Sequence, residues 1–346
     1  MKMIYGDETH GGQLAKASQL YQIPVSDWLD LSTGINPNPW PVPSLPASVY
    51  SRLPEKIEGM DAAVQAYFSA SQYLIGAGSQ AFIQLLPLLF EQQYQRKARV
   101  LVSSLTYCEH RIAWCKHNHD IVMIDFADNP DADTLIAQAD VVIVVNPNNP
   151  TGQLIGKDRL LQWHRVLAAR GAWLIVDEAF IDATPVESLC SDTAKENLFV
   201  LRSVGKFFGL AGIRSGFVFA EDKQLQAINK LMGPWAISGP AGWITEHALI
   251  DSIWQRKAVD KLGESSARLR KLLLTSFDVE IKYTHLFVSL IFDSADQAKS
   301  VFQGLAKQGV LTRIFPTANL IRFGIPENET AWLRLESSLR DLAPGA

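Results

Sequence analysis

Cysteine is scarce in this chain of 346 residues, which contains three: Cys108, Cys115 and Cys190. An odd, irregularly spaced set predicts neither a disulfide framework nor a zinc site, and it suits the reducing cytoplasm. Basic charge is not in excess either, because the net charge is −4, whereas a nucleic-acid-binding protein needs a basic face. We therefore expect a cytoplasmic protein with no metal centre and no nucleic-acid partner.

Long hydrophobic runs are missing as well. The apolar stretches are too short to cross a bilayer, and the acidic N-terminus has no apolar core of the kind found in a secretory signal. Material for a core is nevertheless ample, because 47% of the residues are hydrophobic and 20% are charged. The sequence thus predicts a globular protein of one large domain or two, without membrane association.

Short apolar runs rich in β-branched residues alternate with longer amphipathic segments in the middle of the chain. Runs typical of strands buried on both faces are 99–103, 121–126, 141–145, 172–177, 198–203 and 216–220. Helical segments such as 158–169 lie between them. This alternation predicts an α/β fold with a mostly parallel sheet covered by helices.

The last third of the chain has a different pattern. A long helical region over 223–275 precedes strands 280–283 and 286–292, a helix 295–308 and short strands near 310–314 and 320–324. This mixture predicts a small α+β domain. The first 45 residues or so are rich in proline, from Pro24 to Pro46, which predicts an extended arm. We expect an N-terminal arm over 1–45, a large domain over 46–225 and a small domain over 226–346.

Lys206 is the most informative residue, because apolar side chains and glycines surround it in the sequence. Desolvation lowers the pKa of an amine and makes it a better nucleophile, able to form a Schiff base with an aldehyde. Ser203 and Arg214 flank it, and a hydroxyl with a guanidinium can bind a phosphate. Pyridoxal phosphate carries both an aldehyde and a phosphate, so this segment favours a site for that cofactor.

Three further polar segments follow predicted strands, where α/β proteins bind ligands. Gly76–Gln80 opens a helix and can cradle a phosphate, although a turn with a serine cap is the commoner reason for such a sequence. Asn146–Gly152 is a rigid turn carrying Asn149, and a plain loop connection explains it too. Asp177 ends a strand and needs a cationic partner such as a protonated pyridine nitrogen, unless it caps a helix or joins a buried ion pair.

Other candidate residues have weaker signals. Tyr107 follows a predicted strand and can stack on a planar cofactor, although an aromatic residue there is more often part of the core. Arg313 and Arg322 lie in apolar, strand-like surroundings, where a guanidinium needs a carboxylate or phosphate ligand or a structural salt bridge. His10 precedes two glycines, and its sequence alone gives it no particular role.

The order and spacing of these motifs resemble the fold-type I pyridoxal-phosphate enzymes, the aspartate aminotransferase superfamily, over nearly the whole chain. The resemblance implies a three-layer large domain and a small α+β domain. It implies three catalytic residues: Lys206 holds the cofactor covalently, Asp177 contacts the pyridine nitrogen and Tyr107 stacks on the ring. The other cofactor contacts that it implies are Gly78, Ser79, Gln80, Asn149, Phe180, Ser203 and Arg214.

Within this superfamily the chain is similar to the histidinol-phosphate aminotransferases, and more so to the threonine-phosphate decarboxylases of cobalamin biosynthesis. The carrying segments are Thr9–Gly12, Trp28–Pro37 and Asp177–Asp182. The similarity implies decarboxylation of L-threonine O-3-phosphate by a homodimer whose active site is completed by the neighbour's arm. The substrate contacts that it implies are His10, Gly11, Gly34, Asn149, Arg313 and Arg322.

Several positions depart from the family pattern. Phe180 stands where many relatives have a tyrosine, Gly34 where an asparagine can occur, and Gly205 where a threonine often precedes the lysine. Leu53 stands where relatives often have a tyrosine that reaches the neighbouring subunit, and Tyr50 is the nearest substitute. Two alternatives stay open: a histidinol-phosphate-type aminotransferase with the same cofactor residues, and a protein that binds the cofactor without catalysis.

Overall fold

The computed structural model describes residues 10–55, 57–126 and 129–342. The chain divides into two compact units, which we call the small unit (residues through 38, 150–152 and from 256 onward) and the large unit (39–149 and 153–255). These bounds differ from the expected ones. The N-terminal segment belongs to the small unit, and the large unit extends beyond residue 225 as far as Gln255, because packing contacts and not sequence pattern decide the division.

A seven-stranded sheet forms the centre of the large unit, in the order β2-β8-β7-β6-β5-β3-β4. The strands are β2 (Tyr73–Gly76), β3 (Arg99–Ser103), β4 (Asp120–Ile124), β5 (Val141–Val145), β6 (Trp173–Asp177), β7 (Leu198–Ser203) and β8 (Gly216–Phe219). Neighbours from β7 to β4 are parallel, and β8 is antiparallel to both β7 and β2. The predicted mostly parallel α/β sheet is confirmed.

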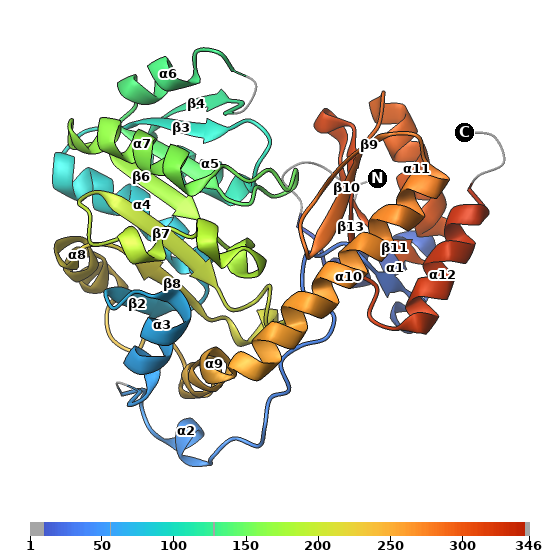
Figure 1. The fold of residues 1–346 in the computed structure, drawn as a ribbon, viewed down its shortest axis with the longest axis horizontal. Coiled ribbons are helices and arrows are strands. Elements are labelled where there is room, and N and C mark those ends of the chain that lie inside the picture. The colour runs from blue at the N-terminus through green and yellow to red at the C-terminus, as the bar shows by residue number, and fades with distance from the viewer. Residues whose placement is uncertain (1–9, 56, 127–128, 343–346) are drawn as a thin grey trace. The chain divides into compact units, whose positions relative to one another are not determined.

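Helices cover both faces of this sheet, which explains why its strands read as nearly unbroken apolar runs (Figure 1). On one face, a single apolar core joins the sheet to α4 (Ser79–Tyr94), α5 (Cys108–Lys116) and α8 (Asp222–Met232). On the other face, α7 (Lys157–Ala168) contacts β6 and α6 (Ala132–Gln138). The remaining helices of the large unit are α2 (Ser48–Ser51), α3 (Met60–Phe68) and α9 (Gly239–Ile250).

The small unit contains the predicted α+β elements. Its antiparallel sheet has the order β12-β13-β10-β9, and a parallel pair joins β1 to β11. The strands are β1 (Leu29–Asp30), β9 (Glu280–Tyr283), β10 (Phe287–Ile291), β11 (Val310–Leu311), β12 (Arg313–Phe315) and β13 (Leu320–Gly324), and the helices are α1 (Leu14–Tyr21), α11 (Ala295–Lys307) and α12 (Glu329–Arg340). The unit boundary falls within α10 (Ser252–Ser276).

Hydroxyl and amide side chains fix where several helices begin. The side-chain oxygen of Ser294 accepts a hydrogen bond from the backbone N–H of Gln297 at the start of α11, and Asn328 does the same at the start of α12. Such caps satisfy N–H groups that have no partner inside the helix. Single turns of 3-10 helix occur at Val25–Asp27, Ile181–Ala183, Pro185–Glu187, Cys190–Asp192, Ala211–Ile213 and Pro316–Ala318.

The N-terminal segment departs from the predicted extended arm over its first part, whereas residues 31–46, which hold most of its prolines, form neither helix nor strand. It forms α1 and then β1, in which Leu29 pairs with Val310. Trp28 and Leu31 are buried in the apolar core of the small unit. Burial of one such side chain contributes about 1.5–3 kcal/mol, so these apolar residues hold the part of the segment around β1 against the small unit. Thr9 lies outside the described residues.

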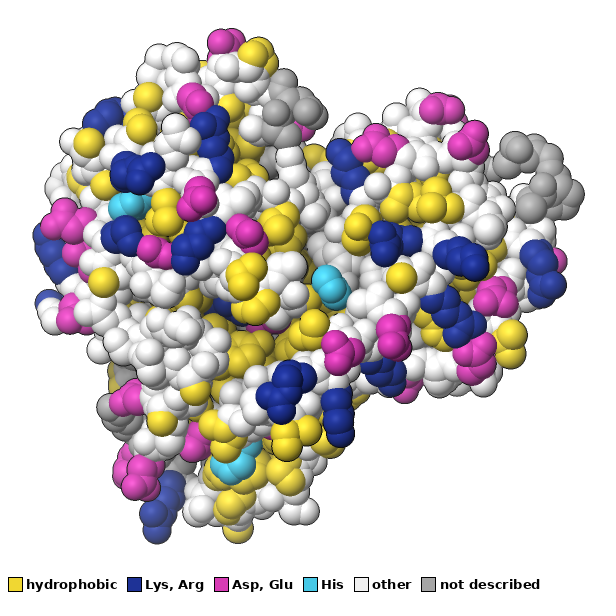
Figure 2. All heavy atoms as spheres, in the orientation of Figure 1, with side chains coloured by type: hydrophobic (Ala, Val, Ile, Leu, Met, Phe, Trp, Pro, Cys, Tyr) yellow, Lys and Arg dark blue, Asp and Glu magenta, His cyan; other side chains and the backbone are white. Residues whose placement is uncertain are grey.

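No helix among the described residues combines the length and the apolar character needed to span a membrane. On the face drawn in Figure 2, basic and acidic side chains lie interspersed with each other. Cys108, Cys115 and Cys190 form no disulfide.

Candidate active site

The predicted cofactor motifs meet at the carboxyl ends of the parallel strands of the seven-stranded sheet. Asp177 ends β6, beside the ends of the parallel strands β5 and β7. Gly216, the first residue of β8, pairs both with Ser203 at the end of β7 and with Gly76 at the end of β2. All four predicted cofactor segments therefore lie where strands end, at the same end of the sheet, as expected for a ligand site of this fold class. These segments are the glycine turn, the Asn-Pro turn, Asp177 and the Lys206 segment.

Two glycines allow a close approach of backbone and guanidinium at this edge. A Cβ added to Gly216 would lie 2.4 Å from the backbone nitrogen of Ser79, and one added to Gly78 would lie 2.6 Å from Nη2 of Arg214. Gly78 is the N-cap of α4, so the serine cap considered above is absent and the first turn has no side-chain cap. Exposed N–H groups beside a guanidinium form a cradle that suits a phosphate.

Asp177 is buried and held by two hydrogen bonds. Its Oδ1 accepts from the backbone N–H of Ala179 at 3.1 Å, and its Oδ2 lies 2.9 Å from Nε2 of His110, which is also buried. Since a carboxylate only accepts, Nε2 of His110 carries the proton. The sequence analysis missed His110. The sequence feature that could have indicated His110 is its position three residues after Tyr107. The two rings lie 6.2 Å apart, edge to face.

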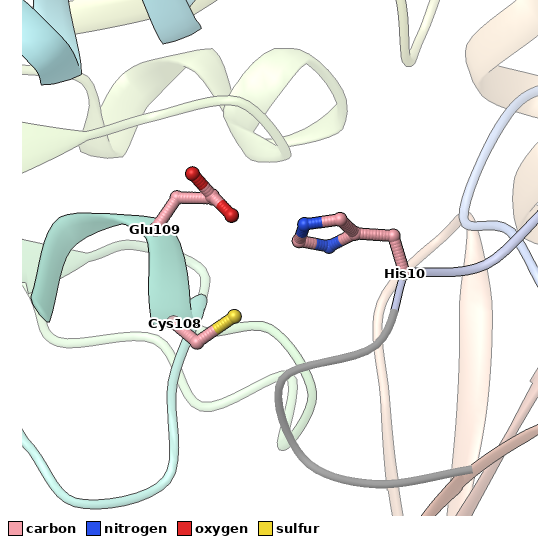
Figure 3. A group of neighbouring side chains, drawn as sticks. All are labelled: His10, Cys108 and Glu109. Atoms are coloured by element: carbon pink, nitrogen blue, oxygen red, sulfur yellow. The ribbon is translucent and has the colours of Figure 1, made fainter. Parts of the chain in front are cut away.

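Tyr107 immediately precedes α5. Burial raises the pKa of its phenol above the usual range, and the negative charges of Glu109 and Asp177 raise it further. The neutral hydroxyl donates to Oε1 of Gln80 at 3.3 Å, and Nε2 of Gln80 donates to Oε2 of Glu109 at 2.6 Å. Figure 3 shows Cys108 and Glu109 in the first turn of α5. The amide of Gln80 thus connects α4 to α5 beside the predicted stacking ring.

Lys206 follows β7 in a turn anchored by the buried rings of Phe207 and Phe208. Its Nζ lies 5.7 Å from the centroid of the Phe180 ring. A Cβ added to Gly205 would lie 3.0 Å from Cα of Ala211, so the threonine common in relatives does not fit here without a shift. Glycine at this position avoids that close contact.

The turn that carries Asn149 is fixed by its neighbour Asn148, which is buried. Oδ1 of Asn148 accepts from the hydroxyl of Thr106 at 2.6 Å, and Nδ2 donates to the backbone oxygen of Leu105 at 2.9 Å. The amide oxygen and the amide nitrogen of Asn148 are therefore both engaged in hydrogen bonds that hold the turn, and the neighbouring Asn149 is half-buried.

Several predicted substrate residues gather around one pocket of the small unit. The pocket is lined by His10, Gly11, Gly12, Gln13, Ser32, Phe302, Leu311, Thr312, Arg313 and Ile314. His10, whose ring is drawn in Figure 3, is exposed, whereas Arg313 is buried. Gly34, also predicted to bind substrate, is buried but does not line this pocket.

Arg322 lies directly opposite Arg313 in the antiparallel pair β12–β13, and it too is buried. Its Nη2 donates to the backbone oxygen of Ser32 at 2.8 Å. Burial lowers the pKa of Arg322 to about 9, and the positive charge of Arg313 contributes to the shift. Two buried guanidinium groups in neighbouring strands oppose each other's charge, so an anion bound near them would be stabilised.

The chain is similar to known proteins over nearly its whole length. Residues 56–337 match the family model of aminotransferase class I and II. The threonine-phosphate decarboxylase of Pseudomonas aeruginosa is 43% identical over 331 residues, which cover 95% of this chain and 96% of that protein. The threonine-phosphate decarboxylase of Sinorhizobium sp is 34% identical over 352 residues, covering 95% of this chain and 97% of that protein.

Among solved structures, a histidinol-phosphate aminotransferase from Sinorhizobium meliloti, in complex with pyridoxal-5'-phosphate, has a similar fold. Its TM-score is 0.73 at 18% identity, over 98% of this chain and 89% of that chain. The resemblance drawn from the sequence motifs is thereby confirmed. The chain belongs to the aminotransferase class I and II family.

Proposed function

We propose that this protein decarboxylates L-threonine O-3-phosphate to (R)-1-amino-2-propanol O-2-phosphate, with pyridoxal phosphate as its cofactor. The observation that carries the proposal is the likeness, over nearly the full length, to two proteins named threonine-phosphate decarboxylase. The product would enter cobalamin biosynthesis. The homodimer and the cytoplasmic location expected from the sequence remain predictions.

The strand-end residues of the large unit fit this cofactor. In the proposed site, Lys206 binds its aldehyde, and Ser79, Ser203 and Arg214 bind its phosphate. The close approach of the Arg214 guanidinium to Gly78 supports this, since a side chain at Gly78 would fill the cradle. The remaining contacts of the proposal are Gly78, Gln80, Tyr107, Asn149, Asp177 and Phe180. When bound, pyridoxal phosphate supplies a ring that accepts the electron pair of a bond broken at the substrate's α-carbon.

Asp177 has the position and charge to keep a proton on the pyridine nitrogen, because an ion pair favours the charged form of both partners. The hydrogen bond from His110 fixes the carboxylate of Asp177 in one orientation. Lys206, or a water, returns a proton to the α-carbon after CO2 has left. The bond between the α-carbon and the carboxylate breaks, and a C–H bond replaces it, so no oxidant or reductant is needed.

We propose that the arginines select the bond that breaks. When bound, the cofactor would favour cleavage of the α-carbon bond that the protein orients toward its π system. An arginine that binds the substrate's carboxylate would favour loss of the α-proton, as in an aminotransferase. Arg313 and Arg322 would bind the phosphate instead, which would make the carboxylate the group that is lost. Their joint burial in neighbouring strands supports the binding of a doubly charged group.

The test compares CO2 release from L-threonine O-3-phosphate by the wild-type holoenzyme with release by Arg322→Ala and Arg340→Ala. Arg340 is an exposed arginine of the same unit and serves as the control. We expect Arg322→Ala to lower kcat/KM at least tenfold and Arg340→Ala to leave it unchanged, since a charge-assisted hydrogen bond contributes about 1.5–3 kcal/mol. An unchanged rate in Arg322→Ala would contradict the proposed arrangement of the substrate.

A further inference from the structure

Thr312 is a buried residue of the pocket wall in the small unit. It lies between β11 and β12, it is 2% exposed, and it lines the pocket together with Arg313. Its hydroxyl oxygen is buried and has no hydrogen-bond partner among the residues that the structure describes. A buried hydroxyl in this state costs stability, whereas a methyl group of the same shape would not. Thr312 thus has a polar atom that the described part of the chain leaves without a hydrogen bond.

The pocket has the chemistry of an oxyanion site. No aspartate or glutamate occurs among the described residues that line it, whereas Arg313 and His10 do. Arg322 adds a second buried guanidinium directly across the strand pair from Arg313. A hydroxyl beside these groups can donate to an anionic oxygen, a stronger bond than one to a neutral acceptor.

Ser32, which also lines the pocket, has a hydroxyl that is already engaged in two hydrogen bonds. The backbone N–H of Gly12 donates to Oγ of Ser32 at 2.8 Å, and that hydroxyl donates to Oδ1 of Asp30 at 2.6 Å. The direction of this chain is fixed, because an amide only donates and a carboxylate only accepts. The proton of the Ser32 hydroxyl therefore points to Asp30 and is not offered to the pocket, which leaves Thr312 as the hydroxyl donor among the described residues that line it.

We propose that Thr312 is a further substrate-binding residue, whose hydroxyl donates a hydrogen bond to a phosphate oxygen of the substrate. The inference rests on the proposed function for the identity of the ligand. It predicts that the hydroxyl is neutral or unfavourable for the stability of the free protein and favourable for binding. A threonine with a purely structural role would show the reverse.

Three holoenzyme variants separate these roles. Thr312→Val removes the hydroxyl and keeps the shape, whereas Thr312→Ser keeps the hydroxyl. Thr193→Val is the matched control, because Thr193 is equally buried and its hydroxyl donates to the backbone oxygen of Cys190 at 2.8 Å. The melting temperature, the affinity for inorganic phosphate by calorimetry and the KM for L-threonine O-3-phosphate are measured for each.

We expect Thr312→Val to weaken phosphate binding and raise KM about tenfold to a hundredfold, with a melting temperature equal to or above that of the wild type. Thr312→Ser should keep most of the affinity. Thr193→Val should lower the melting temperature and leave the affinity unchanged. An unchanged phosphate affinity in Thr312→Val, or a fall in its melting temperature like that of Thr193→Val, would overturn the inference.

Two further measurements keep this result separate from the proposed function. L-threonine has the carboxylate but lacks the phosphate, so a loss confined to L-threonine binding would reassign the hydroxyl to the carboxylate and overturn the inference. If the wild type releases no CO2 while Thr312→Val still weakens phosphate binding, the proposed function fails and the role of Thr312 stands. If CO2 is released and Thr312→Val changes nothing, the function stands and the inference fails.

Discussion

Substitution of Gly78 by alanine tests the proposed phosphate cradle. Gly78 has φ +78°, and its new Cβ would lie 2.6 Å from Nη2 of Arg214, although ordinary contacts are at least 3.4 Å. The guanidinium must therefore move by roughly an ångström, which is enough to lose a charge-assisted hydrogen bond of about 1.5–3 kcal/mol. We expect the affinity for pyridoxal phosphate to fall about tenfold to a hundredfold. Backbone strain adds about 1–3 kcal/mol of lost stability.

Gly171→Ala is the control for the strain. Gly171 has φ +69°, and a Cβ there would meet no atom within 4 Å. Both variants should melt at a lower temperature than the wild type, and only Gly78→Ala should lose cofactor affinity in a titration followed by absorbance. If Gly78→Ala binds pyridoxal phosphate as tightly as Gly171→Ala, Arg214 and the start of α4 do not hold the phosphate.

Three other outcomes follow from the same structure. His110→Leu removes the hydrogen-bond donor of the buried Asp177. We expect a fall of about 1–3 kcal/mol in the free energy of unfolding and a lower kcat, with partial rescue of both in His110→Asn. Equal kcat in the wild type and both variants would exclude a role for His110 in orienting Asp177. Burial lowers the pKa of His119 below 6.5, and its Nδ1 accepts the N–H of Ala98. His119 therefore binds a proton more readily in the unfolded chain than in the folded one. The stability that neutral His119 contributes is complete above pH 6.5 and is lost as the pH falls below it. The melting temperature of His119→Gln should thus fall less steeply with decreasing pH than that of the wild type, and equal slopes for the two proteins would refute this assignment. Gly205→Thr would bring a Cβ to 3.0 Å from Cα of Ala211; we expect the displaced Lys206 to slow turnover, and an unaltered kcat would mean that the turn has more room than the structure gives it.

The sequence predicted the large sheet well because its strands are buried on both faces. Val141–Val145, for example, is buried at every position, so the strand appears as a continuous apolar run. The position of the candidate cofactor residues at strand ends was predictable for a related reason. Asp177 and Ser203 are the last residues of parallel strands, and strand ends can be recognised in the sequence before any tertiary contact is known.

The features that the sequence did not predict depend on contacts between distant residues. β1 has two residues, and it is a strand because Leu29 pairs with Val310. The helical region after residue 225 has no local break that marks the unit boundary at Gln255. His110 follows Tyr107 by three residues, but its role depends on a hydrogen bond to the distant Asp177. The roles of Ser32 and Thr312 depend on a contact with Gly12 and on a hydroxyl without a hydrogen-bond partner among the described residues, and both depend on tertiary structure.

The most direct test of the proposed function counts CO2 molecules released per active site when the holoenzyme acts on L-threonine O-3-phosphate without any keto acid. A decarboxylase needs no acceptor, so we expect steady release over many turnovers and no accumulation of the amine form of the cofactor. No CO2 release, together with conversion of the cofactor to its amine form by histidinol phosphate or glutamate, would contradict the proposal and identify an aminotransferase.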